Sequence, residues 1–136
     1  MGDYFAHWIE IGKNAPDKSK LPMIFNVNWF RKNPEGKFLW PGYGDNIRAL
    51  KWIFDRLEGT DNAVETAVGY VPKPGSIDTE GLDGIEKYMP EILKTDKNEW
   101  FAEAELITAH YATFGDRLPS ELKNQFEALK ARLLKS

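Results

Sequence analysis

Residues 28–46 constrain the fold more than any other part of the chain. They read N-W-F-R-K-N-P-E-G-K-F-L-W-P-G-Y-G-D-N. Within them, Asn-Pro-Glu-Gly at 33–36 matches a type I turn, because Pro presets φ at the second position and Gly is favoured at the fourth. Strand-forming residues are frequent on both sides of this turn, at 23–30 and at 37–40. The pattern therefore predicts an antiparallel hairpin.

The predicted hairpin is rich in aromatic residues. It holds Trp29, Phe30, Phe38, Trp40 and Tyr43. Aromatic faces brought in from different strands can sandwich a flat base, at roughly 1–3 kcal/mol per stacked base. The sequence thus indicates a pocket for a flat aromatic ligand. The competing interpretation is that these side chains are core, which is the commoner role of aromatic residues on a hairpin.

A helix is predicted to begin where the hairpin ends. Asp45 and Asn46 are both good N-cap residues. An Asn amide carries a donor and an acceptor, so Asn46 could read the O6 edge of a guanine. The positive end of a helix favours phosphates. Four basic residues add positive charge there: Arg31, Lys32, Lys37 and Arg48.

The rest of the chain predicts a mixed α/β fold. Helical spacing of apolar residues places helices at 1–11, 46–58, 91–94, 97–114 and 120–133, and a short strand is expected at 64–71. The apolar faces are Tyr4, Trp8 and Ile11 in the first helix, and Ile47, Leu50, Ile53, Phe54 and Leu57 in the second. We expect the second face to lie on the hairpin. Asp96 should cap the helix that follows it, and the last two long helices should form an αα-hairpin.

The domain organisation follows from these elements. We expect an antiparallel aromatic hairpin and a short strand packed with about four helices. Residues 1–136 would form one domain, or part of a larger one, with the hairpin and base pocket at 22–58 and a helical part at 89–136.

Composition and missing motifs exclude several functions. A net charge of −3 argues against nucleic acid as a partner, and the chain has no cysteine for a disulfide or a thiolate metal site. No apolar run is long enough to span a membrane, and the acidic start is unlike a signal peptide. No G-x-x-x-x-G-K-[S/T] phosphate loop, metal-ligand spacing or nucleophile arrangement occurs. The sequence therefore indicates a candidate base-binding surface and contains no recognisable chemical centre.

One long segment resembles a known family. The run F-N-V-N-W-F-R-K-N-P-E-G-K-F-L-W-P-G-Y-G-D-N-I-R resembles the guanine-binding segment of GTP-dependent phosphoenolpyruvate carboxykinase, which has the form N-W-F-R-K-…-G-…-F-L-W-P-G-F-G-E-N-x-R. M-G-D-Y-F-A-H-W, V-G-Y-V-P-K and F-G-D-R-L-P also resemble that family. The similarity extends over essentially the whole chain but only over the C-terminal part of the family's length. We therefore expect a fragment of a larger enzyme.

The resemblance implies roles for four positions. Phe30 and Tyr43 match the aromatic residues that flank the guanine ring, Phe38 matches a third aromatic wall, and Asn46 matches the amide that reads the base. Tyr43 stands where the family usually has Phe, and Asp45 where Glu is common. A Tyr ring keeps the stacking face, but its hydroxyl needs water or a partner.

The resemblance also implies the activity of the parent enzyme. It would be a cytoplasmic, monomeric lyase of gluconeogenesis that converts oxaloacetate and GTP to phosphoenolpyruvate, CO2 and GDP. Its phosphate loop, its manganese or magnesium ligands and its oxaloacetate-binding residues would lie upstream. This chain would contribute no catalytic residue and no metal ligand. It would bind GTP or GDP, be inactive alone, expose apolar surface and self-associate.

Two other readings of the residues stay open. The exposed aromatic residues could form a stand-alone interaction module that binds a peptide or a proline-rich segment. Alternatively, the chain could be a structural domain in which every aromatic residue is core.

Overall fold

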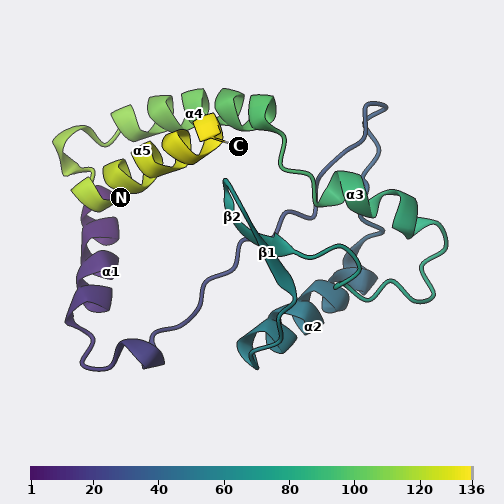
Figure 1. Ribbon diagram of the computed structural model, residues 1–136. Helices are drawn as coiled ribbons and strands as arrows, with labels where there is room; N and C mark the ends of the chain where they lie inside the picture. The colour runs from purple at the N-terminus through teal and green to yellow at the C-terminus, as the bar shows by residue number, and fades with distance from the viewer. Residues whose placement is uncertain (136) are drawn as a thin grey trace. The chain divides into compact units, whose positions relative to one another are not determined.

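The computed structural model describes residues 1–135 and has the predicted mixed α/β class (Figure 1). Its elements are α1 (Gly2–Asn14), α2 (Asn46–Leu57), β1 (Ala63–Thr66), β2 (Gly69–Pro72), α3 (Met89–Ile92), α4 (Lys97–Ala112) and α5 (Ser120–Lys135). The two strands form one antiparallel sheet. The chain divides into two compact units, which we call the helical unit (residues 1–22 and from 95 onward) and the central unit (residues 23–94).

The helical unit contains the predicted αα-hairpin. Asp96 caps α4 as expected, because its Oδ1 accepts from the backbone N–H groups of Asn98 at 2.9 Å and Glu99 at 3.1 Å. Helices α4 and α5 pack on each other, with the rings of Tyr111 and Phe126 5.7 Å apart, edge to face. Leu133 of α5 is the most deeply buried large side chain described. This packing confirms the predicted αα-hairpin.

Helix α1 joins the helical unit through a face other than the predicted one. Phe5 packs edge to face on Phe114, with ring centroids 5.8 Å apart. Gly2 is buried against the backbone of residue 117, where a Cβ at position 2 would clash with the carbonyl oxygen of Arg117. The apolar side chains at positions 4, 8 and 11 are instead exposed. The helix was predicted correctly, but its apolar stripe is not its packing face.

The central unit is built around two buried tryptophans. Trp40, Trp52, Ala63 and Ile77 form its core. The Trp52 indole N–H donates to the carbonyl of Asn62 at 3.1 Å and to the hydroxyl of residue 76 at 3.0 Å. The Asn62 amide donates in return to the Trp52 carbonyl at 3.1 Å. These bonds tie α2 to the residue that precedes β1 and to the loop after β2.

The aromatic hairpin is much shorter than predicted. The turn at 33–36 forms, with the Gly36 N–H donating to the Asn33 carbonyl at 2.9 Å, and one antiparallel bridge joins Lys32 to Phe38. Residues 23–30 are not a strand. The Asn28 side chain accepts from the backbone N–H of residue 30 at 2.9 Å, a local turn that competes with strand pairing. The prediction of a full ladder between 23–30 and 37–40 was therefore wrong.

Residues 64–71, predicted as one strand, belong to a tight hairpin. Strands β1 and β2 pair with Val64 opposite Val71 and Thr66 opposite Gly69. Thr66 Oγ1 donates to the Gly69 carbonyl at 2.7 Å, and Gly69 has a φ of 122°. A positive φ suits glycine, and here it lets the chain reverse immediately after a two-residue loop.

Helix α2 also packs differently from the prediction. Its buried residue is Trp52, whereas the side chains expected to cover the hairpin are largely exposed: Ile47, Leu50, Phe54 and Leu57. Ile53 alone of the expected stripe packs against the core. The helix is held in place by the indole of Trp52 and by its N-terminus. The other apolar side chains therefore form an exposed row along its length.

Candidate nucleotide-base site

An open cleft of ≈ 730 Å³ lies in the central unit and is lined by all four residues singled out from the sequence: Phe30, Phe38, Tyr43 and Asn46. Small-molecule sites commonly measure about 300–1,000 Å³. The other lining residues are Trp29, Leu39–Gly42, Gly81–Asp83, Ile85 and Tyr88. The structure thus brings the predicted residues to one hollow.

The aromatic walls of the cleft are exposed. Phe30 is 71% exposed, Phe38 56% and Tyr43 93%. The rings of Phe30 and Phe38 lie on the two arms of the short hairpin, with centroids 6.0 Å apart and planes at 64°. These rings are therefore not core, and they present exposed aromatic surface to a flat ligand.

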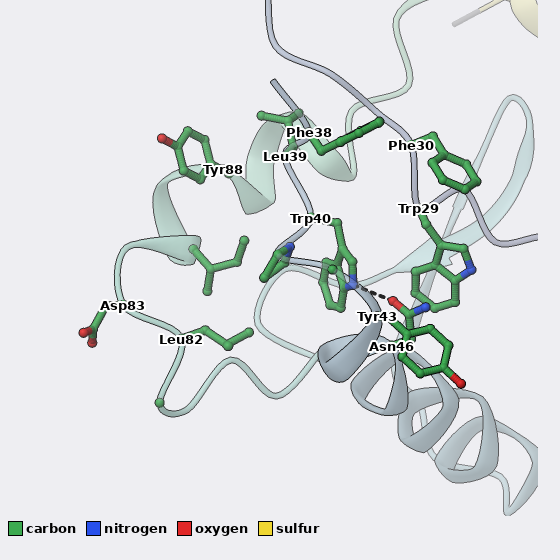
Figure 2. Close-up of a pocket in the computed structure, with 14 residues that line it drawn as sticks. Trp29, Phe30, Phe38, Leu39, Trp40, Tyr43, Asn46, Leu82, Asp83 and Tyr88 are labelled. Carbon is green, nitrogen blue, oxygen red and sulfur yellow. Dashed lines mark hydrogen bonds between the residues drawn. The ribbon is translucent and has the colours of Figure 1, made fainter. Parts of the chain in front are cut away.

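Backbone geometry places Tyr43 and Asn46 at the N-terminus of α2. Gly42 has a φ of 134°, a value that side-chain-bearing residues avoid, and a single 3-10 turn (Tyr43–Asp45) leads from it into the helix. Asn46 is the first residue of α2. Its Oδ1 accepts from the Trp40 indole N–H at 2.9 Å (Figure 2). The amide that was predicted to read a base is thus anchored to a buried ring.

The expected capping role of Asp45 is not observed. Asp45 precedes α2, but its side chain makes no bond to the backbone N–H groups of the helix. Its Oδ1 instead accepts from Arg48 Nε at 3.1 Å, and Arg48 also donates to the carbonyl of Asp78 at 3.1 Å. Arg48 therefore fastens the start of the helix to the loop after β2.

The basic residues near the cleft are largely engaged with neighbours. Arg31 donates to the Lys94 carbonyl at 2.7 Å and lies 3.5 Å from a carboxylate oxygen of Glu91. The Lys32 ammonium lies over the Phe38 ring, 4.9 Å from its centroid. A guanidinium held by a carboxylate offers less charge to a phosphate. The positive potential near the cleft is therefore weaker than the number of basic residues in the sequence suggested.

One wall of the cleft was not anticipated from the sequence. Leu82, Asp83, Ile85 and Tyr88 come from a segment that reads as loop and short turns. The Asp83 carboxylate points away from Trp40 and Asn46 (Figure 2). Only the repeated glycines at 81 and 84, both with positive φ, mark this segment in the sequence, and they do not say where it packs.

Within residues 1–135, no three His, Cys, Asp or Glu side chains are grouped so as to hold a metal ion. The same residues include no helix long and apolar enough to cross a membrane. The two histidines do not lie at the cleft: His7 is an exposed residue of α1, and His110 of α4 packs its ring 5.0 Å from that of Phe114.

Comparison with known proteins identifies the family of this chain. Residues 1–132 match the family described as the phosphoenolpyruvate carboxykinase C-terminal P-loop domain, and the chain belongs to that family. The resemblance drawn from its motifs is thereby confirmed. The phosphate-loop pattern itself does not occur in the 136 residues.

Relatives of this chain that carry the name phosphoenolpyruvate carboxykinase (GTP) include the following three proteins. The Treponema pallidum (strain Nichols) protein is 53% identical over 134 residues, which is 98% of this chain and 22% of that protein. The Renibacterium salmoninarum protein is 48% identical over 132 residues, 97% of this chain and 22% of that protein. The Arthrobacter sp. protein is 46% identical over 133 residues, 97% of this chain and 21% of that protein. The chain thus spans about a fifth of the length of these relatives.

Proposed function

We propose that the cleft binds the guanine base of GTP or GDP. The observation that carries this proposal is the meeting of three exposed aromatic rings with one anchored amide: Phe30, Phe38, Tyr43 and Asn46 line the same hollow. Exposed rings offer stacking, which is tolerant of base identity. An amide offers hydrogen bonds to the base edge, which distinguish one base from another.

The base site would serve a reaction completed by residues outside this chain. We propose that the whole protein is a cytoplasmic, monomeric lyase that acts in gluconeogenesis. It would decarboxylate oxaloacetate and phosphorylate the resulting enolate with GTP, yielding phosphoenolpyruvate, CO2 and GDP. Holding the base orients the γ-phosphate, and this positioning is the chain's contribution. We propose that the manganese or magnesium ligands lie in other residues of the whole protein; residues 1–135 contain no group of three His, Cys, Asp or Glu side chains placed to hold a metal ion.

Tryptophan fluorescence tests the base site directly. Trp29 and Trp40 line the cleft, so a stacked base should quench their emission. We expect saturable quenching of this chain by GDP and none by ADP at the same concentrations. Asn46→Ala should abolish the preference while leaving the thermal unfolding transition in place. Equal responses to GDP and ADP would contradict guanine recognition by these residues.

The peptide-binding module remains the second candidate because exposed aromatic rings also suit proline-rich segments. The peptide-binding hypothesis predicts no preference among nucleotides. It also predicts a fluorescence response to a proline-rich peptide, and this response should be unchanged in Asn46→Ala. A guanine site predicts the opposite on both counts.

We also propose that the chain has no carboxykinase activity alone and that it self-associates. Self-association would follow from the exposed apolar row of α2. Turnover of oxaloacetate and GTP by the purified chain would contradict the first statement. A monodisperse monomer in sedimentation velocity would contradict the second.

A further inference from the structure

The anchored amide of Asn46 has a consequence for base selectivity. We infer that Trp40 is a specificity-determining residue: its indole N–H fixes the orientation of the Asn46 amide, so that only the donor end of the amide faces the base. The inference rests on the proposed guanine site and adds to it the residue that decides between guanine and adenine.

The chemistry of the two side chains fixes the orientation. An indole nitrogen is a donor only, whereas an amide has a carbonyl oxygen that accepts and an NH2 group that donates. The Trp40 N–H lies 2.9 Å from Asn46 Oδ1. Rotating the amide by half a turn would place two donors against each other and forfeit this bond. The indole therefore holds the carbonyl end and turns the NH2 group of the amide away from itself.

The Trp40 ring is itself held in place. It is 8% exposed and belongs to the core of the central unit, and the Trp29 ring lies 6.0 Å away. A buried indole has little rotamer freedom, so its N–H direction is set by packing before any ligand arrives. The position of the Asn46 donor is preset in the same way.

A fixed donor discriminates between purines at one position of the ring. Guanine and hypoxanthine carry an oxygen at position 6, which accepts a hydrogen bond. Adenine carries an amino group there, which is a donor and would face the amide NH2 unfavourably. Without Trp40, the amide could rotate and offer its oxygen to adenine. Selectivity for the 6-oxo purines would then fall, even with Asn46 present.

Substitution of Trp40 by Phe tests this directly, because it keeps an aromatic ring and removes the N–H. The affinities of GDP, IDP and ADP would be measured by calorimetry on the 136-residue chain. We expect the ratios of GDP to ADP affinity and of IDP to ADP affinity to fall together by about tenfold, the effect of one hydrogen bond lost and one mismatch relieved. IDP lacks the 2-amino group, so its parallel behaviour assigns the effect to position 6.

Trp29→Phe is the matched control. Trp29 lines the same cleft and packs on the same ring, yet it does not bond to the Asn46 amide. We expect Trp29→Phe to weaken GDP and ADP alike and to keep their ratio. A ratio that Trp40→Phe leaves at the wild-type value overturns the inference while the guanine site stands. Wild-type protein that binds GDP and ADP equally overturns the site and the inference together.

Indole hydrogen exchange gives a second readout that does not need a folded Trp40 variant. In the wild-type chain, the Trp40 indole proton should exchange with solvent far more slowly than that of Trp8, whose side chain is 60% exposed. Asn46→Ala should accelerate exchange at Trp40 and leave Trp8 unaffected. Unchanged protection of the Trp40 proton in Asn46→Ala would show that burial, and not the bond to Asn46, holds the indole, and the inference would fail.

Discussion

Truncation of Phe30 to Ala separates binding from folding, because this side chain is exposed at the cleft. Fully burying a Phe side chain contributes about 1.5–3 kcal/mol. Phe30 is 71% exposed, so less than a third of that is at stake in the unliganded protein, under about 1 kcal/mol. A stacked base contributes about 1–3 kcal/mol, which corresponds to a loss of about 5- to 150-fold in GDP affinity.

Phe54→Ala is the matched control for this change. Phe54 lies on α2 in the same unit, is 64% exposed and does not line the cleft. GDP affinity would be measured by calorimetry and stability by urea unfolding for both variants. We expect similar small losses of stability, and a loss of affinity in Phe30→Ala alone. The stacking argument is refuted if the two variants bind GDP equally well, or if Phe30→Ala costs several kcal/mol of stability.

Two further predictions concern stability. Gly2→Ala should destabilise the helical unit because the new Cβ would meet the Arg117 carbonyl oxygen. Gly12→Ala, in open space on the same helix, should instead stabilise the unit by about 0.5–1 kcal/mol. Thermal unfolding of the two variants compares these effects, and equal effects would contradict the packing of α1. Lys73 donates to Asp61 at 2.6 Å and holds the pKa of that carboxyl below its ordinary value of 3.8. A carboxyl group whose pKa is lower in the folded than in the unfolded state stabilises the fold at pH values above the unfolded-state pKa. This contribution is lost as the pH falls through the folded-state pKa. Lys73→Met should therefore unfold at lower urea than wild type at neutral pH. The difference should become smaller well below pH 3.8, where only the bond from Lys73 to the Asp61 carbonyl, at 3.1 Å, remains. A difference that stays constant down to acid pH would exclude the ion pair as its cause.

Local signals in the sequence predicted local structure well. The turn at 33–36 and the cap at Asp96 form as expected, because each depends on a side chain and a backbone N–H only a few residues apart. The predicted αα-hairpin of α4 and α5 also forms, since two long helices joined by a short link can pack on each other. Four residues were predicted to share a base pocket, and they do line one cleft, but their binding role stays a prediction.

The incorrect predictions concern segments whose structure is determined by tertiary contacts. Residues 23–30 have strand composition, yet the Asn28 turn and the anchoring of Phe25 on Trp52, 6.3 Å between rings, replace pairing along their length. The hairpin at 63–72 was read as one strand because Ala67 and Val68 carry no turn signature. The packing face of α2 was misjudged because one buried indole with two hydrogen bonds outweighs a longer apolar stripe.

The position of Tyr43 between Gly42 and Gly44 sets the thermodynamic character of the cleft. Its side chain is 93% exposed and its neighbours on both sides lack a Cβ, so the unliganded ring is restrained by little. Stacking on a base must immobilise it, which costs about 0.5–1.5 kcal/mol for one side chain. The wall formed by Trp40 and Asn46 is rigid, whereas the wall formed by Tyr43 assembles around the ligand. Nucleotide binding should accordingly be driven by enthalpy, opposed by entropy and accompanied by a negative heat-capacity change.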